Sequence, residues 1–159
     1  MPFAIRSAML DDIPAILAIE QQAASAAHWP PKQYEKLVST GVVLVAEQAG
    51  KVHGFVCAKD AAGEWEIENV VAARESLRQG LADQLINALI VQAEKAAASR
   101  ILLEVRESNQ PARRLYEKHA FREVGRRRNY YNQPLEDAIL YERRCQSGKQ
   151  PGRASHSTG

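Results

Sequence analysis

The centre of this 159-residue chain changes its hydrophobic period twice, and this change constrains the fold more than any other feature. The run from Trp65 to Ala72 is rich in β-branched residues and partly alternates, as expected of a strand. From Leu81 apolar residues recur at helical spacing until near Ser99, and the apolar run Ile101 to Val105 follows at once. A strand, a helix and a second strand in this order predict a crossover with parallel strands.

Shorter elements are expected on both sides of this crossover. They are a strand at Phe3–Arg6, helices that open at Asp11–Pro14 and after Trp29–Pro31, strands at Val42–Glu47 and Val52–Lys59 joined by the turn Gln48–Lys51, a helix capped by Ser108 or Asn109, and strands near Phe121–Arg127 and Ala138–Arg143. The expected fold is therefore mixed α/β. Its sheet is mostly antiparallel, with a central parallel βαβ crossover flanked by helices.

Length and charge limit the domain organisation and the partners. Residues 1–145 suit a single domain, and residues 146–159 form a polar tail that we expect to be flexible. The tail holds Lys149 and Arg153 and no acid, so the rest of the chain has 19 basic and 19 acidic residues. A neutral body disfavours direct nucleic-acid binding. Two distant cysteines, an N-terminus without an apolar segment and the lack of a long apolar run predict a cytoplasmic protein without a membrane partner.

A carboxylate lies inside the second strand of the crossover. Glu104 has apolar neighbours, and an unpaired carboxylate in such a strand is costly. It is therefore either a site residue or the ion-pair partner of an arginine such as Arg106 or Arg127. The following helix carries Tyr116, for which core packing and a role in chemistry are both open.

A turn with a glycine joins the first strand of the crossover to its helix. It runs from Leu77 to Ala82 and includes Arg78 and Gly80. Free N–H groups at the start of the helix, with the helix dipole and a cation beside them, favour an anion such as a pyrophosphate. The glycine could equally relieve a tight turn. The turn matches neither the dinucleotide fingerprint nor the P-loop.

Together these segments resemble the GNAT N-acetyltransferase superfamily over nearly the whole chain to Cys145, and within it the bacterial ribosomal-protein-alanine N-acetyltransferases of the RimI type. The superfamily pattern at the start of the helix is Q/R-x-x-G-x-G/A. The narrower resemblance is carried by Ile19–Ala23, Leu103–Asn109, Arg127–Tyr131 and Glu136–Ala138. The turn departs from the pattern at Leu77 and Ala82, and Ala73-Arg74-Glu75 replaces the usual D-P-x. These departures predict weaker coenzyme binding rather than another coenzyme.

The resemblance implies the GNAT acyltransferase fold, acetyl-CoA as the cosubstrate and direct attack of an amine in a ternary complex. It gives Glu104 the role of general base, acting through a water, and Tyr116 the role of the acid that protonates the departing thiolate. The residues implied to bind the coenzyme are Val70, Val71, Ala72, Arg78, Gln79, Gly80, Leu81, Ala82, Asp83 and Asn109. No metal is expected, because the four histidines show no ligand spacing with either cysteine.

The implied acceptor is the N-terminal alanine of a ribosomal protein of the small subunit, and the enzyme is expected to be a monomer or weak dimer. An α-amino group with a pKa near 8 is about one-tenth neutral at pH 7, so a modest base suffices. Tyr130 and Tyr131 are implied to shape the acceptor groove, with His28 and Trp29 on its other wall.

Other functions are compatible with the same pattern. Relatives within the superfamily acetylate lysine side chains, other protein N-termini or small amines. A chain whose turn has degenerated at Leu77 could also be a non-catalytic acyl-CoA-binding domain, although it retains Glu104 and Tyr116. The basic and aromatic run from Arg126 to Tyr131 could form a nucleic-acid surface, which the neutral body disfavours.

Overall fold

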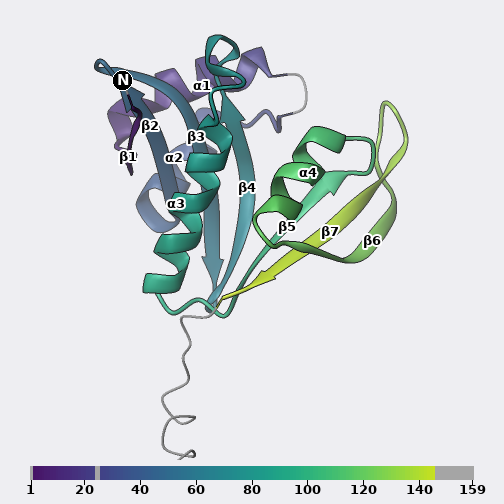
Figure 1. Ribbon diagram of the computed structural model, residues 1–159. Helices are drawn as coiled ribbons and strands as arrows, with labels where there is room; N and C mark the ends of the chain where they lie inside the picture. Colours follow the sequence, from purple (N-terminus) through teal and green to yellow (C-terminus); the bar gives the residue numbers. More distant parts are fainter. Residues whose placement is uncertain (1, 24–25, 146–159) are drawn as a thin grey trace, which may run out of the picture. The chain divides into compact units, whose positions relative to one another are not determined.

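The strand, helix and strand predicted at the centre of the sequence form in the computed structural model, which describes residues 2–23 and 26–145. They are β4 (Glu64–Ala72), α3 (Leu81–Lys95) and β5 (Arg100–Arg106) (Figure 1). The two strands begin together: Ser99 N donates to Gly63 O at 2.8 Å, and Arg100 Nε donates to Glu64 Oε2 at 3.0 Å. Strands that start side by side and are joined by a helix are what a crossover requires.

The helix α3 ends at Lys95, earlier than the predicted end near Ser99. Ala97 adopts a left-handed conformation with φ of 61°. Ala98 N then donates to Ala93 O, and Ala97 N donates to Glu94 O, both at 3.0 Å. These bonds satisfy carbonyl groups that a helix end leaves open. A glycine usually marks such an end, and an alanine in its place hid it from sequence reasoning.

The packing of the described residues separates two compact units. The first holds the described residues up to Asp60 and Glu66–Leu89, and the second holds Ala61–Trp65 and the described residues from Ile90 onward. The predicted single domain over residues 1–145 stays a prediction, and the predicted flexible tail, residues 146–159, lies outside the described residues. In the part of the chain that is described, no helix is long and apolar enough to cross a membrane.

The first unit contains β1 (Ala4–Ser7), β2 (Val42–Gln48), β3 (Lys51–Ala61) and most of β4, in that order across the sheet. The pairs β1–β2 and β2–β3 are antiparallel, with Val45 opposite both Arg6 and Phe55. Ala49 and Gly50, with φ of 54° and 75°, make a two-residue turn between β2 and β3, inside the predicted turn Gln48–Lys51. Two residues with positive φ give the turn twist that a hairpin favours.

The core of the first unit lies between these strands and the helices α1 (Ile13–Gln22) and α2 (Pro31–Thr40). Ile16, Tyr34, Val45 and Phe55 are completely buried there. Full burial of such apolar side chains is worth about 1.5–3 kcal/mol each. In Figure 1, α1 and α2 lie behind the strands of this unit, and the part of α3 that belongs to it lies in front. Short 3₁₀ helices at Leu10–Asp12 and Arg74–Ser76 were not predicted.

The second unit combines β5 with α4 (Gln110–Lys118), β6 (Arg122–Tyr131) and β7 (Glu136–Arg144). The strands follow the order β5-β7-β6, and both pairings are antiparallel. Glu104 of β5 lies opposite Leu140, and Arg127 of β6 lies opposite Ala138. The mixed α/β fold with a mostly antiparallel arrangement is confirmed.

Arg6 and Asp12 join β1 to the start of α1. Arg6 Nη1 and Nη2 donate to the two Asp12 carboxylate oxygens at 2.8 and 2.9 Å, and Met9 N donates to the same carboxylate at 2.7 Å. Arg6 Nε also donates to Glu47 of β2 at 2.7 Å. The Arg6 hydrogen bonds hold the pKa of the Asp12 carboxyl below its ordinary value.

We expect Asp12→Asn to lower the free energy of unfolding at pH 7 by about 1–3 kcal/mol, because the substitution removes charge-assisted hydrogen bonds. A depressed carboxyl pKa stabilises the fold above the unfolded value, near 3.9, and this gain is lost as the pH falls through the folded value. The difference between the two proteins should therefore narrow below about pH 4. Urea unfolding at several pH values measures it, with the exposed neighbour Asp11→Asn as control. A constant difference down to pH 3 would contradict the prediction.

Candidate active site

Glu104 lies on the less buried face of β5. Ile101, Leu103 and Val105 are buried, and the side chain of Glu104 on the opposite face is 20% exposed. Arg127 Nε donates to Glu104 Oε2 at 2.5 Å, so the ion pair considered from the sequence forms with this arginine. The pair offsets the cost of a carboxylate in the strand and leaves part of the side chain accessible.

Two tyrosines of β6 lie beside this ion pair. The guanidinium carbon of Arg127 is 5.7 Å from the centre of the Tyr130 ring, and that of Arg106 is 4.3 Å from the Tyr131 ring. Such cation–π contacts hold aromatic rings in place. Burial raises the pKa of Tyr131, and the nearby charge of Glu104 raises it further. The structure thus brings Glu104 together with both tyrosines predicted to shape the acceptor groove.

Tyr116 of α4 packs in the core of the second unit. Its ring centre is 5.7 Å from Phe121 and 6.3 Å from Tyr141, and its burial raises the pKa of the hydroxyl. The packing role considered from the sequence is therefore present. Among the described residues, no side chain or main-chain group forms a hydrogen bond with the Tyr116 hydroxyl. The hydroxyl therefore has no partner among the described residues that would compete for its proton, and its predicted acid role stays a prediction.

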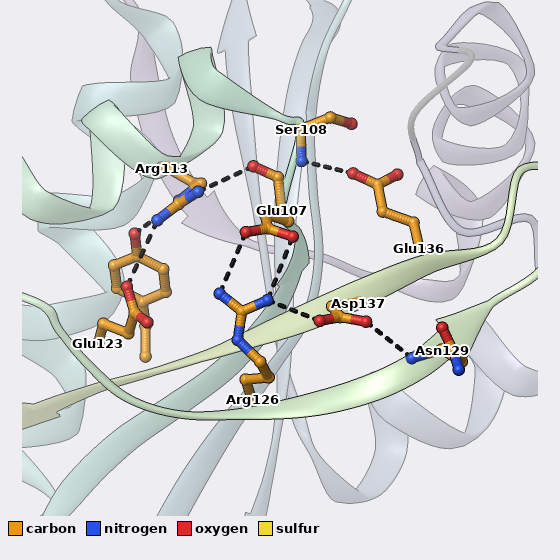
Figure 2. Close-up of polar contacts among 9 residues, drawn as sticks. Glu107, Ser108, Arg113, Glu123, Arg126, Asn129, Glu136 and Asp137 are labelled. Carbon is orange, nitrogen blue, oxygen red and sulfur yellow. Dashed lines mark hydrogen bonds and ion pairs between the residues drawn. The ribbon is translucent and has the colours of Figure 1, made fainter.

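Arg126 holds β6 to its neighbours through two carboxylates, as Figure 2 shows. Its guanidinium donates to both oxygens of Glu107, at 3.2 and 3.1 Å, and to Asp137 Oδ2 at 2.6 Å. The other oxygen of Asp137 accepts from Asn129 N at 2.8 Å, where the chain has a φ of 53°. We call Glu107, Arg126 and Asp137 the arginine clamp. It shapes the irregularity of β6 between Arg127 and Tyr131.

The segment between β5 and α4 is held by polar contacts in the same region (Figure 2). Arg113 donates to Glu107 O at 2.9 Å and to the Tyr141 hydroxyl at 3.0 Å. Ser108 N donates to Glu136 at 2.5 Å. Asn109 is the N-cap of α4, because its Oδ1 accepts from Ala112 N at 3.2 Å. Of the two caps considered from the sequence, Asn109 is the correct one, and its side chain already has this structural role.

The pairing of the arginines also bears on the basic run in β6. Arg126 is shared by two carboxylates, and Arg127 is paired with a third. An arginine engaged in this way offers less of its charge to a phosphate backbone. The arrangement favours the interpretation of β6 as part of an acceptor site over that of a nucleic-acid surface.

The predicted coenzyme turn belongs to the first unit and follows β4. Gly54 of β3 lies so close to this strand that a Cβ there would be 2.9 Å from Val71 O. His53 fixes the next residues: its carbonyl accepts from Ala73 N at 2.7 Å, and its Nδ1 lies 3.0 Å from the hydroxyl oxygen of Ser76. From the sequence, this histidine was considered only as a possible metal ligand.

The turn itself contains two residues with positive φ, Arg78 at 70° and Gly80 at 73°. Arg78, Gln79 and Gly80 are exposed, and open space surrounds the position of a Cβ at Gly80. Leu81 is buried, so it could contact a coenzyme only through its main chain. The residues ahead of α3 are exposed, which is compatible with an anion site, and the coenzyme turn stays a prediction. In the described residues no cluster of histidine, cysteine and carboxylate side chains could hold a metal ion.

Residues 10–121 match the family model for the Acetyltransferase (GNAT) family, which spans most of the chain. The chain belongs to this family. It is therefore an acyltransferase, and enzymes of this family use acetyl-CoA. The resemblance inferred from the sequence is confirmed.

Curated relatives and solved structures agree with this assignment. The [ribosomal protein bS18]-alanine N-acetyltransferase of Escherichia coli (strain K12) is 34% identical over 139 residues, covering 86% of this chain and 93% of that protein. The crystal structure of the ribosomal-protein-S18-alanine N-acetyltransferase from Escherichia coli has a TM-score of 0.81 and covers 88% of this chain and 92% of its own. NAA60 of Arabidopsis thaliana, solved with a bisubstrate analogue, has a TM-score of 0.81 at 20% identity, covers 91% and 99%, and shares the fold alone.

We expect Arg126→Gln to loosen the irregular part of β6, because Glu107 and Asp137 then lose their shared cation. Asp137 should hold the Asn129 amide less firmly, and that amide should exchange with solvent at least about fivefold faster. Arg128→Gln removes the same charge two residues away and serves as the control. Amide hydrogen exchange followed by NMR measures the effect. Equal protection of Asn129 in both variants would contradict the role of the arginine clamp.

Proposed function

We propose that this protein transfers the acetyl group of acetyl-CoA to the N-terminal α-amino group of a ribosomal protein, at an N-terminal alanine, in the cytoplasm. The observation that carries the proposal is the 34% identity, over most of both chains, with an enzyme named for that acceptor. Glu104, with Tyr130 and Tyr131 beside it, supports an amine site in the second unit.

In the proposed reaction, the amine nitrogen attacks the carbonyl carbon of the thioester directly. Glu104 accepts the proton of the amine through a water. The bond between carbon and sulfur then breaks, and the Tyr116 hydroxyl returns a proton to the thiolate. The raised pKa of Tyr116 keeps this hydroxyl protonated at neutral pH, as an acid must be at the start of the reaction.

An α-amine suits this machinery better than a lysine does. The ordinary pKa values of the two groups, near 8 and 10.4, differ by an amount equivalent to about 3 kcal/mol in the cost of deprotonation. A carboxylate that works through a water is a modest base and can serve the α-amine. A lysine acceptor would need a stronger base, or surroundings that lower the pKa of its amine, to offset the higher cost of deprotonation.

The coenzyme is proposed to bind through β4 and the following turn of the first unit, and Asn109 stays a predicted coenzyme residue. Its pantetheine arm would pair with the main chain of Val70–Ala72. Its pyrophosphate would accept hydrogen bonds from the N–H groups of residues 78–83, with Arg78 as counter-charge. Since main-chain groups supply most of these bonds, Leu77 in place of the family's Gln or Arg should weaken binding without abolishing it.

Turnover of a matched set of acceptors tests the proposed substrate. The set is a short peptide with a free N-terminal alanine, the same peptide blocked at its N-terminus with one free lysine, and a polyamine. Selective turnover of the free alanine peptide is expected. Turnover confined to the lysine peptide or the polyamine would move the protein to another acceptor class of the family.

Glu104→Gln should lower kcat at least about 100-fold, because the amide cannot take up the proton of the amine. Binding of acetyl-CoA, measured by calorimetry, should not change. Glu123→Gln removes an exposed carboxylate in the same unit and should leave kcat within about twofold of the original value. Full activity of the Glu104 variant would remove this residue from the mechanism.

Tyr116→Phe separates the packing and acid roles of this residue. The phenyl ring keeps the contacts with Phe121 and Tyr141, and no hydrogen bond among the described residues is lost, so the thermal midpoint should stay the same. kcat should fall about 10- to 100-fold if the hydroxyl protonates the thiolate. An unchanged kcat would leave Tyr116 with its packing role alone.

A further inference from the structure

A buried carboxylate in the first unit has no part in the chemistry above. Glu20 of α1 is only 1% exposed. Its Oε2 accepts from the Tyr34 hydroxyl at 2.5 Å and from Trp29 N at 2.9 Å. A carboxylate this far from water is costly unless fixed donors satisfy it. An apolar residue would fill the same space at a lower desolvation cost. The groups that donate to Glu20 therefore indicate the role of the carboxylate at this position.

Asn69 of β4 extends these contacts. Its side-chain amide, also buried, donates to the Tyr34 hydroxyl at 3.3 Å and to Ala27 O at 3.0 Å. Tyr34 is therefore the bridge between a residue of α1 and a residue of β4. We call Glu20, Tyr34 and Asn69 the Glu20 hub.

The hub tethers the main chain of residues 27–29, which precede α2. One bond is made to the N–H of Trp29 and another to the carbonyl of Ala27. The Trp29 ring also packs on Tyr34, with ring centres 5.6 Å apart, and His28 Nδ1 lies 3.6 Å from Glu20 Oε1. Polar bonds of fixed geometry specify the path of a segment more sharply than apolar contacts do.

The same hub reaches the strand that is proposed to carry the coenzyme. Asn69 directly precedes Val70–Ala72, and β4 alternates so that Asn69 and Val71 are buried and Val70 and Ala72 are partly open. The hub therefore connects residues 27–29 to β4 at the point where the coenzyme segment begins. Such a connection sets the position of residues 27–29 relative to β4.

We propose that Glu20, acting through the hub, is a positioning residue that holds residues 27–29 in place for the acceptor peptide. The proposal rests on the proposed function and on the part in acceptor binding that the family resemblance implies for His28 and Trp29. Glu20 acts through the main chain of Trp29 rather than on the reacting atoms. Its loss should therefore affect the KM of the peptide and leave kcat and the KM of acetyl-CoA largely unchanged.

Three variants test the tether. Glu20→Leu removes both acceptor oxygens, Glu20→Gln keeps one, and Tyr34→Phe removes the bridging hydroxyl while keeping its ring. In Glu20→Leu the Trp29 amide should exchange with solvent about tenfold faster or more, and the peptide KM should rise about tenfold. Glu20→Gln and Tyr34→Phe should give smaller changes in amide exchange and in peptide KM. They also provide the test if the Glu20→Leu variant does not fold. kcat and the KM of acetyl-CoA should stay within about twofold.

Asp12→Asn is the matched control, because Asp12 is another buried, hydrogen-bonded carboxylate of the first unit. It should lower stability without raising the peptide KM. An equal rise in peptide KM in the control and the Glu20→Gln variant, or unchanged protection of the Trp29 amide in all three variants, would overturn the proposal. Failure of the unaltered enzyme to acetylate a free alanine peptide would instead reject the proposed function, and Trp29 exchange would still decide whether the tether exists.

Discussion

Fixed donors hold the buried and half-buried carboxylates of both units, and the positions of these donors decide how the nearby chain runs. Arg6 holds Asp12, and Arg100 holds the buried Glu142 with Nη1 at 2.5 Å from its carboxylate. Glu104 has Arg127, and Glu20 has a tyrosine and a main-chain N–H. Because an unsatisfied buried carboxylate is expensive, each of these contacts restricts the local fold to arrangements that supply the donor.

In the second unit this constraint connects the strand edge to the proposed chemistry. The arginine clamp fixes β6 at Arg126 and shapes the irregular stretch that follows. The next residue, Arg127, then lies opposite Ala138 and reaches Glu104 on β5. Tyr130, in turn, lies against Arg127. The arginine clamp thus shapes the strand beside the proposed base, Glu104, without forming an ion pair with it.

The sequence predicted what depends on period and on local signals. Strands and helices follow from the spacing of apolar residues, and the turn Gln48–Lys51 follows from its place between two strand-like runs. The cap at Asn109 follows from a hydrogen-bonding side chain just ahead of a helix. The end of α3 was missed because Ala97 occupies a position that usually holds glycine. The Glu20 hub was missed because its partners lie 9 and 14 residues away on other elements. The one signal in the sequence was that Glu20 follows the helical spacing of the apolar residues Ile13 and Ile16. Hydrophobic spacing alone does not say why a glutamate occupies such a position.

The fold alone does not select the acceptor, because one fold hosts enzymes that act on different amines. The resemblance implies a part in acceptor binding for His28 and Trp29 of the first unit and for Tyr130 and Tyr131 of the second. Three of the hydrogen bonds that hold these segments reach main-chain atoms: the N–H of Trp29, the carbonyl of Ala27 and the N–H of Asn129. A bond to the main chain does not depend on the side chain at that position. The side chains that face an acceptor can therefore change while the segments keep their path, which allows acceptor preference to diverge within one fold.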